Sequence, residues 1–145
     1  MKKYKFTNRS KRIGSIIVRQ IKRIADGKLG GYIQKESNLS HEGDCWVSKN
    51  AVVSGNAWVF GDSKVRGKAK VFGSSRVYGN SKVNGDAWVC GSSCVFEKAK
   101  VGENAKVFGN AIVCGEATVC GEATVCGAAK ICGTSKLTAG FTDAQ

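Results

Sequence analysis

Residues 57–80 read AWVFGD, SKVRGK, AKVFGS and SRVYGN when the sequence is divided every six positions. Each hexad has a small residue first, valine third and glycine fifth. The aliphatic position recurs sixteen times without an insertion, as valine from Val47 to Val125 and then as Ile131 and Leu137. Glycine fills the fifth position in twelve of the sixteen hexads, and the exceptions are Lys49, Glu97, Glu103 and Ala139.

A hexad is too short to hold a strand and a helix, so each unit is expected to be one short strand and one corner. Side chains alternate along a strand, which places the small residue and the valine two positions later on the same inward face. Glycine at the corner accepts a positive φ without strain. Three hexads then close a triangular coil of eighteen residues, and stacked coils bury a core that no single coil could bury. The fold class is therefore all-β, a rod of about five triangular coils and roughly 25 Å in height at normal strand spacing.

The hexad spacing resembles the signature of left-handed β-helix proteins, a group that includes the hexapeptide-repeat acyltransferases. The run Gly30-Gly31-Tyr32-Ile33, followed by Asn38-Leu39-Ser40 and Gly43-Asp44-Cys45-Trp46-Val47, further resembles the leading segment of YdcK-like hexapeptide proteins of bacteria and bacteriophages. The resemblance implies a single-stranded left-handed β-helix and a phage or prophage origin, with a counter-defence role against a host protein as an analogy. A right-handed β-helix of the bactofilin type is the alternative, but repeats of that type are usually less strict in length.

Three segments follow from this pattern: a basic N-terminal capping segment at 1–44, the β-helix at 45–138 and a C-terminal tail at 139–145. Within the first segment, Ile17, Val18, Ile21 and Ile24 fall at helical spacing. The phage resemblance instead favours a hairpin of residues 3–7 and 16–24. We favour strands, with the segment covering the open edge of the first coil.

The net charge is +12, and nine of these excess charges lie in residues 1–30. Residues eighteen apart should stack, which produces a basic column on one face. Such a surface favours an anionic partner, namely nucleic acid, a nucleotide or an acidic host protein. The alternatives are a solubilising terminus and a solvated face that prevents association. The candidate binding residues are Lys64, Arg66, Lys82, Lys100, Lys136, Arg19 and Arg23.

A second face carries outward apolar side chains that should not remain in water. We expect them to form a homo-oligomer contact, with a trimer favoured and a dimer as the alternative. Burial under the folded-back N-terminal segment is the other explanation. The expected interface residues are Trp58, Phe60, Tyr78, Phe96 and Ile112.

An acyltransferase-like activity would require a general base, and His41 is the one histidine in the chain. It lies before the first regular coil, and the repeat holds no insertion that could form a substrate loop. Cys114, Cys120, Cys126 and Cys132 are six residues apart, so four thiolates cannot converge on one metal ion. No cofactor is therefore expected, and a non-enzymatic scaffold is the leading hypothesis, with the enzyme using His41 as the alternative.

The sequence shows neither a secretory signal nor an apolar run long enough to span a membrane. We therefore expect a protein of the cytoplasm, that of the host bacterium if a phage encodes it. The seven cysteines should be reduced there.

Overall fold

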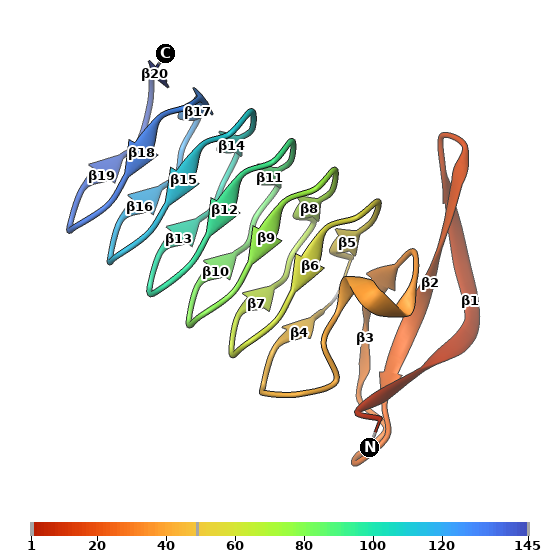
Figure 1. Cartoon of the computed structure of the whole chain (residues 1–145). Helices are drawn as coiled ribbons and strands as arrows, with labels where there is room; N and C mark the ends of the chain where they lie inside the picture. Colours follow the sequence, from red (N-terminus) through yellow and green to blue (C-terminus); the bar gives the residue numbers. More distant parts are fainter. Residues whose placement is uncertain (1, 49, 145) are drawn as a thin grey trace.

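The chain forms a three-sided β-helix of about six turns, seen from the side in Figure 1. The computed structural model describes residues 2–48 and 50–144. Each coil strand pairs in parallel with the strand three positions later, and Val47 lies beside Val65 as Val65 lies beside Val83. The predicted all-β β-helix, with coils of eighteen residues, is confirmed.

The strands fall into three sheets, one on each side of the coil. We name these sides by their outward residues as the mixed face, the aromatic face and the lysine face. The sheet of the mixed face has the order β1 (Tyr4–Ile13), β2 (Ile16–Arg23), β3 (Leu29–Ile33), β5 (Val52–Val53), β8 (Lys70–Val71), β11 (Trp88–Val89), β14 (Lys106–Val107), β17 (Thr124–Gly127) and β20 (Phe141–Ala144). The sheet of the aromatic face holds β6 (Trp58–Val59), β9 (Arg76–Val77), β12 (Cys94–Val95), β15 (Ile112–Val113) and β18 (Lys130–Ile131). The sheet of the lysine face holds β4 (Trp46–Val47), β7 (Lys64–Val65), β10 (Lys82–Val83), β13 (Lys100–Val101), β16 (Thr118–Val119) and β19 (Lys136–Leu137).

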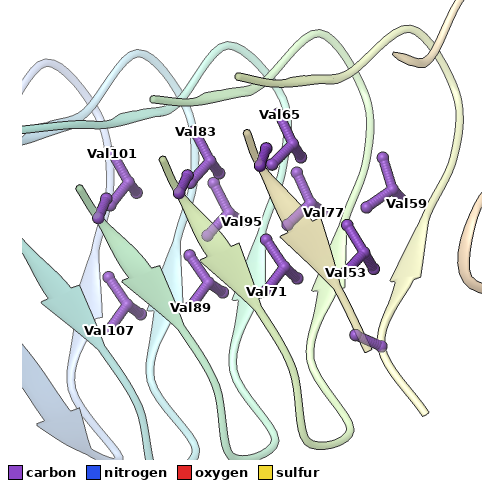
Figure 2. Close-up of a cluster of buried hydrophobic side chains, with 14 of the residues drawn as sticks. Val53, Val59, Val65, Val71, Val77, Val83, Val89, Val95, Val101 and Val107 are labelled. Carbon is purple, nitrogen blue, oxygen red and sulfur yellow. The ribbon is translucent and has the colours of Figure 1, made fainter. Parts of the chain in front are cut away.

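Columns of valine fill the interior of the coil, and Figure 2 shows ten of them pointing inward from successive strands. Each of these valines is fully buried, which contributes about 1.5–3 kcal/mol per side chain. The small residue two positions earlier is also buried. Where it is serine, the hydroxyl donates to a corner carbonyl, as Ser81 Oγ does to Tyr78 O at 2.7 Å. The narrow core therefore tolerates serine without leaving a buried hydroxyl unsatisfied.

Most corners depend on a backbone conformation that favours glycine. Gly73 has a φ of 71°, and a Cβ there would lie 2.9 Å from both the nitrogen and the oxygen of Gly91 in the next coil. Two of the non-glycine corners anticipated from the sequence, Glu97 and Glu103, adopt the same conformation with φ of 58° and 54°. These two positions carry backbone strain that glycine would relieve. Lys49 is outside the described residues.

The coil begins earlier than residue 45. Strand β3 already pairs in parallel with β5, with Ile33 beside Val53, and Leu39 bridges to Val59. These partners are twenty residues apart instead of eighteen, so two extra residues lie in the corner between Leu39 and Val47. At the other end β20 pairs with β17, so the predicted tail joins the mixed sheet.

Asn38, at the end of the 3-10 turn η1 (Glu36–Asn38), stabilises this irregular first coil. Its side chain is fully buried and makes four hydrogen bonds. Oδ1 accepts from the backbone nitrogens of Gln34 and Lys35, at 3.1 and 2.8 Å. Nδ2 donates to the carbonyls of Gly55 and Ala57 in the coil above, at 3.1 and 2.9 Å.

The N-terminal segment is an antiparallel hairpin, which confirms the strand prediction over the helix. Strand β2 pairs with β3, so the hairpin extends the mixed sheet past the first coil. Tyr4 and Ile21 are buried in the same core cluster as the valines. Gly31 allows β3 to lie close to the backbone of the first coil, because a Cβ at this position would lie 2.7 Å from the carbonyl oxygen of Ala51. No helix in the described part of the chain is long and apolar enough to cross a membrane.

We expect Glu97→Gly to raise the free energy of unfolding by about 1 kcal/mol, because the αL conformation is strained for glutamate and not for glycine. Gly73→Ala should lower it by about 1–3 kcal/mol through the same strain together with the contact with Gly91. Urea denaturation of the two variants beside wild type measures both effects. A Glu97→Gly variant less stable than wild type would contradict the strain assignment.

Asn38→Ala should lower the free energy of unfolding by about 2–4 kcal/mol, because four backbone groups lose their partners in a buried corner. Asn110→Ala is the matched control, since Asn110 is an exposed corner residue farther along the coil. Thermal unfolding followed by circular dichroism compares the two variants. Equal melting temperatures would show that Asn38 does not fasten the first coil.

Candidate functional site

The lysine face carries a line of ammonium groups created by the coil register. Lys82 pairs with Lys64 on one side and Lys100 on the other, as the sequence predicted. Thr118 comes next in the column, and Lys136 follows on the last coil. In the part of the chain that the structure describes, no ion pair involves Lys82 or Lys100.

A cleft of about 1220 Å³ lies where the hairpin meets the start of this column. Among the described residues, one carboxylate, that of Asp44, lines it. We call this hollow the basic cleft, because six cationic side chains surround it: Lys2, Lys3, Arg23, Lys28, Lys64 and Arg66.

A second hollow of about 660 Å³ continues along the lysine face, and we call it the lysine groove. It shares Asp44, Lys64 and Arg66 with the basic cleft, so the two hollows adjoin. The remaining lining residues of the lysine groove are Asp62, Asn80, Lys82, Lys98, Lys100, Glu116 and Thr118.

Backbone carbonyls hold two ammonium groups where the hollows meet. Lys3 Nζ donates to the carbonyl oxygens of Gly43 and Cys45, at 3.1 and 2.7 Å. Lys64 Nζ donates to the carbonyl oxygen of Asp44 at 2.5 Å. A carbonyl oxygen positions an ammonium group but carries no formal charge that would compensate it.

Two other cations of the cleft are paired with carboxylates. Arg23 makes two bonds to Asp26, at 2.9 and 2.7 Å, and this contact holds the pKa of Asp26 far below its usual range. Arg23 also lies over the ring of the buried Trp46, 5.4 Å from its centroid. Lys2 Nζ lies 3.0 Å from Glu36, and the hydrogen bond from Lys2 lowers the pKa of that carboxyl. The cleft cations without a carboxylate partner in the described structure are therefore Lys3, Lys28, Lys64 and Arg66.

Two predicted binding residues lie outside these hollows. The guanidinium of Arg19 lies over Phe6, 4.1 Å from the ring centroid, and Arg19 does not line the basic cleft. Lys136 lies on the last coil, beyond the residues that line the lysine groove. By contrast, three lysines that were not predicted from the sequence line the basic cleft, because the N-terminal segment packs against the first coil. They are Lys2, Lys3 and Lys28.

His41 lies in the enlarged first corner and holds the N-terminus against it. Its Nδ1 accepts the backbone N–H of Lys3 at 3.0 Å, and its ring stacks on Tyr4 with centroids 4.1 Å apart. Its Nε2 lies 3.3 Å from Glu36 Oε2. A general base needs a free lone pair directed at its substrate. In His41, Nδ1 is already an acceptor and Nε2 faces a carboxylate.

The same corner encloses two further titratable groups. Tyr4 Oη lies 2.6 Å from the carbonyl oxygen of Leu39 and 2.8 Å from that of Glu36. Burial, and then the charge of Glu36, raise the pKa of Tyr4, which keeps its hydroxyl a donor. Burial also raises the pKa of the Cys45 thiol, although Lys3 opposes this shift. The corner is built for packing and hydrogen bonding.

The aromatic face presents a ladder of stacked rings. Phe60 and Tyr78 have centroids 4.7 Å apart and Tyr78 and Phe96 have centroids 5.0 Å apart, with ring planes within 6° and 4°. Trp58, which is 44% exposed, stacks on Phe60 at 3.9 Å. Ile112, the fifth predicted interface residue, lies on the same face as this ladder. Ile112 pairs with Cys94 in the neighbouring column.

Cys114 and Cys132 continue the column above Phe96. Burial and the neighbouring Cys132 raise the pKa of the Cys114 thiol. Within the described residues, no group of three histidine, cysteine or acidic side chains is placed to hold a metal ion.

The mixed face combines its cations with an aromatic ring. Trp88 lies between Lys70 and Lys106 of the adjoining coils, whose Nζ atoms are 5.9 and 5.3 Å from its ring centroid. Phe72 meets the same ring edge-on at 5.9 Å. The sequence analysis did not predict this contact, although the spacing of eighteen residues between Lys70, Trp88 and Lys106 places them in one column.

No protein-family model and no curated protein sequence matches the chain. The class of protein is given by the fold, which is that of a β-solenoid.

Proposed function

We propose that this chain is a non-enzymatic β-helical scaffold that binds an anionic partner through the basic cleft and the lysine groove. The observation that carries the proposal is the lining of the cleft, which among the described residues holds six cationic side chains, two of them paired with carboxylates outside the lining, and the one carboxylate of Asp44. A hollow lined by one sign of charge concentrates ligands of the opposite sign. The groove extends the same charge along the coil without ion pairs to Lys82 or Lys100 in the described structure.

We further propose that the scaffold self-associates through the aromatic face. The ring ladder covers several coils, and outward apolar surface of this kind favours burial against another protein surface. The outward columns of this face carry two cations, Arg76 and Lys130, so a second copy would meet little repulsion despite the net charge of +12. On the mixed face, lysines cover the Trp88 ring, which makes that face a poorer contact.

Binding to a sulfated polyanion tests the first proposal. We expect wild type to bind labelled heparin, with a dissociation constant that rises at least about tenfold between 50 and 200 mM salt. Lys82→Glu should weaken binding about tenfold, because it reverses a charge in the lysine groove. Lys106→Glu is the matched control, since it makes the same change on the mixed face. Equal loss in the two variants, measured by fluorescence anisotropy, would show that net charge alone governs binding.

Mass measurement tests the second proposal. Wild type should have about three times the protomer mass of 15.4 kDa by light scattering. Tyr78→Lys should shift the protein to the monomer, because it places a charge in the middle of the ring ladder. Asn84→Lys adds the same charge on the lysine face and should leave the assembly intact. A wild-type monomer would refute self-association.

A further inference from the structure

We infer that the anionic partner is a linear phosphate chain lying along the coil axis, from the basic cleft through the lysine groove. The inference rests on the proposed function and specifies the class of ligand. Its starting point is continuity, because both hollows share Asp44, Lys64 and Arg66. A ligand that occupies both must be long in one direction.

The register of the coil sets the repeat of this track. Lys64, Lys82 and Lys100 occupy one column on successive strands, which are spaced at about 4.8 Å. The cleft adds Lys28 from the hairpin side of the column. The track crosses β4, β7, β10 and β13 and so exceeds about 14 Å before the hairpin is counted. A single phosphate or nucleotide would reach part of it, whereas a chain of about four to six phosphates would contact all of it.

Carboxylates in the lining favour the lysine column as the line of contact. Asp44, Asp62 and Glu116 lie in one corner column of the lysine groove, together with Asn80 and Lys98. A polyanion is repelled by three of these five corner side chains. It is attracted by the lysine column, whose members Lys64, Lys82 and Lys100 lie two residues after the corner on three successive coils. The geometry therefore defines a line of contact.

The lining chemistry of the lysine groove favours a phosphate chain over an acidic protein surface. Stable protein interfaces depend on a desolvated centre of aromatic and aliphatic side chains. None of the ten residues that line the lysine groove is aromatic or a large aliphatic residue. Lysine and arginine on their own are the usual means of contacting a phosphate backbone.

Recognition by this track should not depend on base sequence. Two aromatic rings line the basic cleft in the described structure: Trp46 is 5% exposed and lies beneath Arg23, and the ring of His41 is stacked on Tyr4. A buried ring offers no platform on which a base could stack. The chain should therefore bind through its backbone charge, and inorganic polyphosphate should compete with nucleic acid.

Length dependence is the decisive measurement. Fluorescence anisotropy of the full chain is recorded with labelled oligothymidylates of four and twelve nucleotides, with ATP and inorganic polyphosphate as competitors. We expect the twelve-nucleotide probe to bind at least about thirtyfold more tightly than the four-nucleotide probe. Its dissociation constant should rise about fiftyfold between 50 and 200 mM salt, which corresponds to about four phosphate contacts on a single strand. Polyphosphate should displace the probe, and an oligoadenylate of equal length should bind equally well.

Neutral substitutions locate the contacts. Lys82→Gln and Lys100→Gln should each reduce the slope of log affinity against log salt by about 0.7, because each removes one phosphate contact. Lys106→Gln on the mixed face should leave the slope unchanged. Melting temperatures compared with wild type show that all three variants fold. Equal slopes in all three variants would overturn the track along the lysine column.

The outcomes separate this inference from the function on which it rests. If ATP or the four-nucleotide probe binds as tightly as the twelve-nucleotide probe, the extended ligand is wrong and compact-anion binding stands. If heparin binds and neither phosphate chain does, the phosphate chemistry is wrong. If no polyanion binds at any salt concentration, the inference and the proposed function both fall.

Discussion

Parallel backbone hydrogen bonds between successive coils are the interaction on which the rest of the structure depends. Ser48 N donates to Val65 O at 2.9 Å, and Lys82 N donates to Ala99 O at 3.0 Å, with the same step of seventeen residues throughout the regular coils. This ladder aligns every side chain with its equivalents one coil above and below. A residue type that recurs every eighteen residues therefore forms a continuous column. The column can be a valine core, a ladder of aromatic rings or a line of charge.

Columns of like charge are the unfavourable consequence of this register. Two ammonium groups about 5 Å apart in water repel by about 1 kcal/mol, and each added coil repeats the penalty. The mixed face interrupts its lysines with Trp88, whose ring attracts both Lys70 and Lys106. The lysine face places Lys64, Lys82 and Lys100 side by side with no such relief. An anion lying along that column would remove a repulsion that the fold itself creates, which links the architecture to the proposed ligand.

The repeat made the coil predictable, because one period fixes the inward valine, the corner glycine and the residues that share a face. Contacts outside the period were not predictable in this way. The bonds of Asn38 reach nineteen residues along the chain, and those of Lys3 join residues about forty apart.

The N-terminal segment both covers the edge of the first coil and lines the basic cleft. Pairing of β2 with β3 and burial of Tyr4 cover an edge that would otherwise be open to association. The same packing places Lys2, Lys3 and Lys28 at the start of the lysine column. Without the hairpin the coil would still carry a row of ammonium groups, but the row would have no enclosed end. The hairpin therefore gives a repetitive charged surface a cleft at one end.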